Sequence, residues 1–181
     1  MCSCRKKINI GAPPTLPVFR SVETSPAEWG PSLWKLLHIT AEHIGMSGKP
    51  IIDTDAGQHL QYIINNIGDV LPCPDCQKHA REYLFTNKFN AKDKFGEELQ
   101  IYVRKYMFDF HNAVRGRTTQ PTVVDTVDHC KTLYGSLVFD GGDTIKLNNI
   151  FKIAVAHRVI KGEKYTAWSV KMHKLRLLLN F

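Results

Sequence analysis

Apolar residues recur at intervals of three and four along most of this chain, which is the spacing of a helix with one buried face. The first such stripe consists of Trp34, Leu37, His38 and Ala41. Ser25 precedes it as an N-cap, and Pro26 suits the first helical position, where its missing N–H needs no partner. The pattern predicts a helix that begins at Ser25 and ends before Gly45.

The same spacing predicts further helices, and few segments show the alternation typical of a strand. The expected ranges are 53–67 (with Asp53 or Thr54 as the first residue), 73–84, 94–114, 124–133, 144–160 and 165–179. Gly68 and Gly116 are expected to end the helices before them, and Gly141–Gly142 to form a turn. The sequence therefore predicts an all-α protein.

Three regions of the chain differ in composition. Residues 1–24 contain Gly11 and three prolines, which disfavour a regular helix, so we expect a flexible arm that carries Cys2 and Cys4. Residues 25–134 hold the predicted helical domain. Residues 135–181 form a basic helical extension, whose charges are either a solvated helix face or a docking surface for a partner, a membrane or nucleic acid. Apolar residues at its very end indicate that it docks on something; they are Leu175, Leu177, Leu178, Leu179 and Phe181.

Composition narrows the class of protein without identifying a partner. At 181 residues, of which 43% are hydrophobic, the chain is long enough for one domain with its own core. Its net charge of +7 permits anionic partners but selects none. No apolar run reaches the length of about eighteen residues that a membrane span needs. The basic N-terminus lacks the apolar stretch of a secretory signal.

The most informative motif is a pair of cysteines. Five cysteines are too few and too irregularly spaced for a disulfide-stapled secreted scaffold, but Cys73 and Cys76 are separated only by Pro74 and Asp75. Cys73 stands at the N-cap of a predicted helix, where unpaired N–H groups and the helix dipole favour a thiolate. The pair is therefore a candidate redox dithiol.

Other interpretations of the pair fit the sequence less well. A zinc site would need further ligands from His79, His111, His129 or Cys130, and no second close pair completes it. A thioredoxin-like site would follow a strand, whereas the flanking segments have helical spacing. A structural disulfide across two residues would close almost no loop and so would stabilise little.

Three blocks of this sequence resemble, in order and approximate spacing, those of the Erv/ALR family of FAD-linked sulfhydryl oxidases. The blocks are Trp29–His38 (WGPSLWKLLH), Leu71–Cys76 (LPCPDC) and His111–Arg117 (HNAVRGR). Each block alone is a weak signal, whereas three in register are specific. The resemblance covers about residues 25–134, and the proline after Gly30 and the long tail are most similar to members from large DNA viruses.

The resemblance implies a compact four-helix bundle with a short fifth helix, FAD as the cofactor and, in most members, a homodimer. It also implies that dithiols are oxidised and that electrons pass to oxygen, which yields hydrogen peroxide. Cys73 would exchange with incoming thiols and Cys76 would face the flavin. The positions that match the family's FAD-binding residues are Gly30, Pro31, Trp34, His38, His43, His111, Asn112, Val114, Arg115, Arg117, Lys131 and Tyr134. Arg115 replaces an asparagine and Arg117 a lysine, so a cation for a phosphate is kept.

The expected partners are oxygen and the dithiols of client proteins or of a small thiol-carrier protein. Cys2 and Cys4 are the candidate shuttle that would pass oxidising equivalents to them. We expect a location in the cytoplasm of an infected cell or in the virion, no metal and no nucleic acid. Two rival hypotheses are a zinc-stabilised helical binding module and a scaffold of the same fold that has lost turnover.

Overall fold

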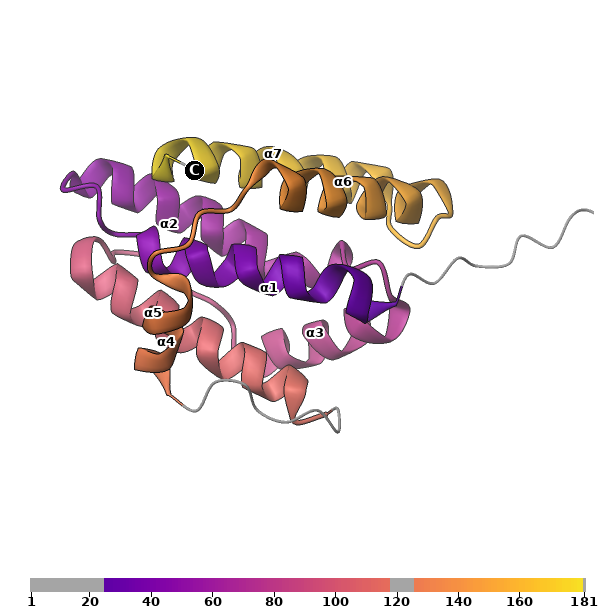
Figure 1. The fold of residues 1–181 in the computed structure, drawn as a ribbon, viewed down its shortest axis with the longest axis horizontal. Helices are drawn as coiled ribbons and strands as arrows, with labels where there is room; N and C mark the ends of the chain where they lie inside the picture. Colours follow the sequence, from indigo (N-terminus) through magenta and orange to yellow (C-terminus); the bar gives the residue numbers. More distant parts are fainter. Residues whose placement is uncertain (1–24, 118–125, 181) are drawn as a thin grey trace, which may run out of the picture.

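The computed structural model describes residues 25–117 and 126–180, and every regular element in these ranges is helical (Figure 1). In chain order the elements are α1 (Pro26–His43), α2 (Pro50–Asn65), the short 3-10 helix η1 (Ile67–Asp69), α3 (Pro74–Thr86), α4 (Gly96–Arg115), α5 (Val127–Tyr134), α6 (Gly141–Ala156) and α7 (Gly162–Leu179). The prediction of an all-α fold is confirmed. The predicted arm with Cys2 and Cys4 lies outside the described residues.

Helix α1 lies in the middle of the molecule, with α4 and α5 on one side and α6 on the other (Figure 1). It begins as predicted, because the Ser25 Oγ accepts a hydrogen bond from the backbone N–H of Ala27 and Pro26 follows at the first helical position. Pro31 is accommodated inside the helix without ending it. Its buried side chains, including Leu33 and Leu37, form the centre of one hydrophobic core. Helix α1 is therefore buried on several sides, by α4, α5 and α6.

A buried ion pair joins the end of α1 to the middle of α4. The Arg104 Nη2 donates to the Glu42 carboxylate, and the Glu42 side chain is only 2% exposed. The Gln100 amide also donates to the Glu42 backbone carbonyl, so α4 holds α1 at two points. Because both charges are withdrawn from water, each depends on the other for compensation.

Replacing Glu42 with alanine should therefore lower the free energy of unfolding by about 3 kcal/mol, because the Arg104 charge would stay buried without its partner. The estimate is at the lower end of the usual range since the Arg104 side chain keeps 18% exposure. Urea denaturation measures the change, and the double variant Glu42→Leu/Arg104→Met is the control. A double variant as unstable as the single one would show that the loss does not come from the unpaired charge.

Helix α2 begins at Pro50, three residues before the predicted start at Asp53. Asp53 is not an N-cap but a buried residue of the first turn, and its carboxylate accepts hydrogen bonds from the Ser47 hydroxyl at 2.6 Å and the Gly96 N–H at 3.0 Å. It thus ties the loop before α2 to the start of α4. The same region is close-packed, because a Cβ on Gly45 would lie 2.2 Å from the Gly96 carbonyl oxygen.

The Gly141–Gly142 pair was predicted as a turn, and this prediction is wrong. Both glycines belong to the first turn of α6, because the Asp140 Oδ1 accepts from the Asp143 N–H at 2.8 Å and caps the helix. The Asp143 carboxylate also forms an ion pair with the Lys35 Nζ at 2.7 Å, and this contact holds the start of α6 against α1. Helices α6 and α7 each begin three residues before their predicted first residues.

The C-terminal extension packs on its own chain. Helix α6 lies along α1 and α7 lies along α2 (Figure 1). Phe151, Trp168 and Leu175 are buried in the same core as the residues of α1 and α2, and the Trp168 indole N–H donates to the Ile63 carbonyl at 3.1 Å. Of the predicted apolar end, Leu175 is buried whereas Leu177 is exposed.

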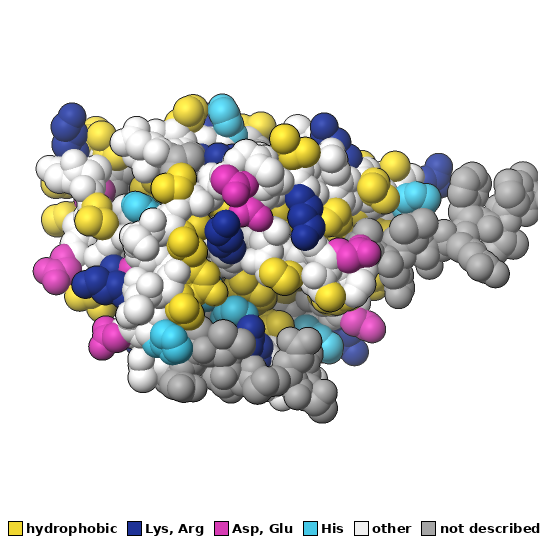
Figure 2. Space-filling model, viewed as in Figure 1, with side chains coloured by type: hydrophobic (Ala, Val, Ile, Leu, Met, Phe, Trp, Pro, Cys, Tyr) yellow, Lys and Arg dark blue, Asp and Glu magenta, His cyan; other side chains and the backbone are white. Residues whose placement is uncertain are grey.

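The outer face of the molecule carries charges of both signs. On the side seen in Figure 2, hydrophobic, basic and acidic side chains are interspersed over α1, α5 and α6. Within the described ranges, no helix is both long and apolar enough to cross a membrane.

Candidate functional site

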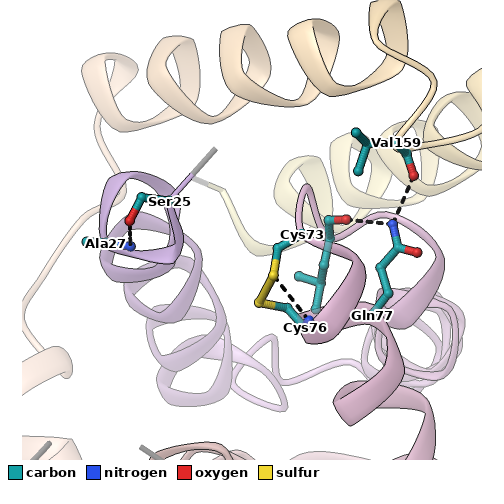
Figure 3. Close-up of a disulfide and its surroundings, with 7 residues drawn as sticks. Ser25, Ala27, Cys73, Cys76, Gln77 and Val159 are labelled. Atoms are coloured by element: carbon teal, nitrogen blue, oxygen red, sulfur yellow. Dashed lines mark hydrogen bonds between the residues drawn. A yellow bond between two sulfur atoms is a disulfide. The ribbon is translucent and has the colours of Figure 1, made fainter. Parts of the chain in front are cut away.

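The cysteine pair caps helix α3, as the sequence predicts. Cys73 is the N-cap, Pro74 is the first helical residue, and the Cys73 Sγ accepts from the Cys76 N–H at 3.2 Å. The two residues form a disulfide with their Cα atoms 5.2 Å apart (Figure 3). Both are half-buried. A sulfur at this position lies at the positive end of the helix dipole, which favours a thiolate over a thiol.

One side chain links the segment before the pair to the C-terminal extension. The Gln77 amide nitrogen donates to the Leu71 carbonyl at 2.8 Å and to the Val159 carbonyl at 3.0 Å (Figure 3). Figure 3 also places Ser25 and Ala27, at the start of α1, in the surroundings of the disulfide. The dithiol is therefore framed by three parts of the chain: α3 itself, the start of α1 and the corner between α6 and α7.

Four rings from three helices form a second group, which we call the ring cluster: Trp34 and His38 of α1, His111 of α4 and Tyr134 of α5. Trp34 stacks on His111 with centroids 4.0 Å apart, and His38 stacks on Tyr134 at 4.6 Å. The His38 Nε2 and the His111 Nδ1 are hydrogen-bonded at 2.9 Å. Packing of α1 against α4 and α5 brings predicted residues of the first and third sequence blocks, together with Tyr134, into contact.

A neighbouring arginine determines which ring nitrogen of His111 and of His38 carries the proton. The Arg115 Nε can only donate, and it lies 3.1 Å from the His111 Nε2, which must therefore accept. His111 then carries its proton on Nδ1 and donates to the His38 Nε2, so His38 is protonated on Nδ1. Both rings are neutral in this chain of donors.

Burial keeps these imidazoles neutral well below neutral pH. Desolvation, with a smaller contribution from the Arg115 charge, lowers the pKa of His38 to about 4. Desolvation, then the neighbouring His38 and Arg115, lower the pKa of His111 to about 3. At neutral pH the cluster therefore presents flat, uncharged rings beside one fixed cation.

A line of aromatic contacts joins the ring cluster to the dithiol helix. Tyr83 of α3 stacks on Phe110 of α4 with centroids 4.7 Å apart, and the Phe110 ring meets Trp34 edge to face at 5.4 Å. Helix α3 thus carries the dithiol at its start and contacts the neighbours of Trp34 two turns later. No motif in the sequence marks Tyr83 or Phe110, because their pairing depends on how α3 packs on α4.

The remaining predicted residues lie in different surroundings. Gly30 and Pro31 precede Trp34 on α1, and Asn112 and Val114 are half-buried beside His111 on α4. Arg117 is exposed and pairs with Glu82 of α3 at 2.9 Å. His43 stands about 140° around α1 from His38, at 100° per residue. Lys131 is exposed on α5, one turn before Tyr134. The structure does not bring His43 or Lys131 into the ring cluster.

The described residues offer no evident metal site and one further thiol. No group of three or more His, Cys, Asp or Glu side chains in residues 25–117 and 126–180 could hold a metal ion. Cys130 of α5 is free and buried, and desolvation raises its pKa to about 11. Its thiol is therefore protonated at neutral pH and unsuited to exchange.

Comparisons with known proteins point to one family. The model of the Erv1/Alr family matches residues 31–134. A protein of Invertebrate iridescent virus 6, named "Putative FAD-linked sulfhydryl oxidase 347L", is 29% identical over 106 residues, which are 58% of this chain and 92% of the relative. The FAD-linked sulfhydryl oxidase of African swine fever virus (isolate Warthog/Namibia/Wart80/1980) is 33% identical over 95 residues, 52% of this chain and 71% of the relative. No solved structure matches the chain.

Proposed function

The chain belongs to the Erv1/Alr family and is an FAD-dependent thiol oxidase, and we propose that Cys73 and Cys76 are its redox-active pair. The observation that carries this assignment is the disulfide at the N-terminus of α3. A bond that closes so short a loop adds little stability, whereas its position at a helix N-terminus favours thiol–disulfide exchange.

The pair would oxidise a client in two exchange steps. A client thiolate attacks the Cys73 Sγ, the Cys73–Cys76 bond breaks, and Cys76 leaves as a thiolate near the N–H groups of the first turn. The second client thiolate then attacks the client sulfur of the mixed disulfide and releases Cys73. The client gains one disulfide, and the enzyme pair holds the two electrons.

The ring cluster and its arginines suit FAD. Trp34, His38, His111 and Tyr134 offer flat rings that are uncharged at neutral pH, which fits the planar ring systems of the cofactor. Arg115 beside the cluster is a fixed cation for the phosphates. The pairing of Arg117 with Glu82 is between exposed groups and therefore weak, so Arg117 is available to an anion as well. When bound, FAD supplies the two-electron acceptor that returns the cysteine pair to its disulfide.

We also propose oxygen as the final acceptor, which balances the reaction as two thiols and O₂ giving one disulfide and one H₂O₂. An oxygen electrode and a peroxide assay, run together with a small dithiol, test this proposal. Equal amounts of disulfide and peroxide support it. Disulfide without peroxide would mean another acceptor. Bound flavin without turnover would favour the degenerate scaffold, and one zinc per chain without flavin would favour the binding module.

A shuttle role for Cys2 and Cys4 remains a proposal, since both lie outside the described residues. If they carry oxidising equivalents to clients, changing both to serine should slow the oxidation of a protein dithiol several-fold more than that of dithiothreitol. The two rates are compared in the same oxygen-consumption assay, with Cys130→Ser as the matched control. Equal rates for both substrates would argue against the shuttle.

The partners and location that we propose follow the family resemblance. We propose protein dithiols or a small thiol-carrier protein as clients, a homodimer as the assembly, and the host cytoplasm or the virion as the location. Mass photometry or analytical ultracentrifugation tests the assembly.

A further inference from the structure

Helix α6 ends in a hydrogen-bond pattern that fixes the conformation of its corner. The Val159 N–H donates to the Ala154 carbonyl at 2.9 Å and the Arg158 N–H to the Val155 carbonyl at 3.0 Å. These are the two bonds of a Schellman motif, in which the residue after the C-cap takes a left-handed conformation. Arg158 occupies that position, with φ of 61°.

An arginine is an unusual choice for this position, which most helices fill with glycine. The other non-glycine residues with positive φ in the described ranges are Asp93 and Asn180, whose short polar side chains tolerate this conformation. The Arg158 side chain is exposed and makes no hydrogen bond or ion pair with any described residue. Packing therefore does not explain the residue, and an unexplained outlier near a reactive site points to function.

A hydrogen bond joins the corner between α6 and α7 to α3, the helix that begins at the dithiol. The Val159 carbonyl, next to Arg158, accepts from Gln77, and Gln77 directly follows Cys76 (Figure 3). The Arg81 Nη2 donates to the Gln77 Oε1 at 3.3 Å, which leaves the Gln77 amide nitrogen facing Val159. Arg81 is held in turn by Asp69 of η1, which also pairs with Lys164 of α7 at 3.4 Å. The corner thus keeps a fixed position beside the disulfide.

The corner is also cationic. His157, Arg158 and Lys161 are exposed, none of them pairs with a described residue, and residues 157–162 contain no acid. The nearest acids along the chain are Asp143 before the corner and Glu163 after it. On α3, Asp75 lies between the two cysteines, and Lys78 adds a further cation. The acids Asp69 and Asp143 are already engaged by Arg81, Lys164 and Lys35.

We propose that this corner, residues 157–161, is a recognition surface for acidic residues that flank the reactive cysteines of a client. The inference rests on the proposed function and names the substrate class for the same dithiol. When a client cysteine reaches Cys73, the residues beside that cysteine must lie against α3, the start of α1 or the corner between α6 and α7. Gln77 directly follows Cys76 and its side chain bonds Val159, which directly follows Arg158, so the flanking residues of a bound client pass beside the corner. Acidic side chains of the client at this place would be attracted by Arg158 and Lys161 and would orient the client.

The test compares two synthetic dithiol peptides, one with aspartates and one with lysines on both sides of a Cys-x-x-Cys, and dithiothreitol as a neutral substrate. The variant Arg158→Asn/Lys161→Gln removes two cations and keeps the corner, because asparagine tolerates the left-handed conformation. We expect kcat/KM for the acidic peptide to fall by about three- to tenfold, the effect of two exposed charges, mainly through KM and less at high salt. Turnover of dithiothreitol should stay unchanged.

The control variant is Lys88→Gln/Lys92→Gln, which removes the same charge beyond the other end of α3, about 20 Å along a helix of 13 residues. It should leave the acidic peptide's kcat/KM at the wild-type value. An equal loss for both peptides in the corner variant, or an equal loss in the control variant, would overturn the recognition surface. If wild-type protein does not oxidise dithiothreitol, the proposed oxidase function fails instead, so the two failures are distinguishable.

Discussion

Replacing Cys76 with serine should abolish dithiol oxidation while the protein still binds FAD. Without Cys76, a client thiolate finds no disulfide to attack, and Cys73 alone cannot hold two electrons. Steady-state oxygen consumption with dithiothreitol should fall by more than about 10⁴-fold, the order seen when an essential nucleophile is removed. Flavin content, read from the absorption of the purified variant, should match the wild type because Cys76 is not part of the ring cluster.

The matched control for this prediction is Cys130→Ser. Cys130 is the one other cysteine among the described residues, and its raised pKa makes it a poor nucleophile. Turnover should survive the control change, although removing a buried thiol will cost some stability. Retained turnover in Cys76→Ser, or loss only in Cys130→Ser, would refute the assignment of the pair.

Acid should destabilise this protein strongly between pH 6.5 and pH 4. His38 and His111 have folded-state pKa values of about 4 and about 3, below the ordinary 6.5, so the unfolded chain binds more protons in this range. Stability due to the two neutral rings is therefore complete above pH 6.5 and is lost as the pH falls toward 4. The loss is on the order of 3 kcal/mol for each ring, which is a large share of a typical folding free energy.

Urea denaturation at several pH values, followed by tryptophan fluorescence, measures this loss. The variant His38→Gln/His111→Gln lacks both titrating groups, so its stability should change much less with pH even if it starts lower. His79→Gln, on the exposed side of α3, should keep the wild-type pH dependence. If the double variant lost stability as steeply as the wild type, the buried imidazoles would not be its cause.

Local chemistry made much of the fold predictable. The N-cap at Ser25 with Pro26, and the N-cap at Cys73 with Pro74, set the starts of α1 and α3 because each feature acts within one helical turn. The start of α2 was missed because Asp53 serves a distant partner, the Gly96 N–H, and not its own helix end. A window that examines only neighbouring residues cannot register such a contact.

In the candidate site too, some features could be predicted from the sequence and others depend on how the helices pack. The spacing of Cys73 and Cys76 marks the dithiol in the sequence itself, because a pair so close must share one turn. The stack of Trp34 on His111 and the direction of the hydrogen bond between His38 and His111 depend on how α1 packs on α4. The contact of Gln77 with Val159 joins residues 82 positions apart. Neither residue carries a motif that would have indicated this contact.

The extension after Tyr134 adds to the domain that the family model matches. Its helices complete the core over α1 and α2, and its corner reaches the dithiol helix through Gln77. Removing it would therefore expose Ile63, Leu36 and their neighbours and also free one side of the frame around the cysteine pair. We expect the extension to be needed for every assay above.

The central claim is that one chain holds FAD and a dithiol that reduces it. The most direct test is a visible absorption spectrum of the purified protein, recorded before and after adding a small dithiol in a sealed cuvette under air. Our account predicts a flavin band that bleaches once oxygen is exhausted, returns on re-aeration, and stays unbleached in Cys76→Ser. A colourless protein, or a flavin band that the dithiol leaves unchanged in the wild type, would contradict it.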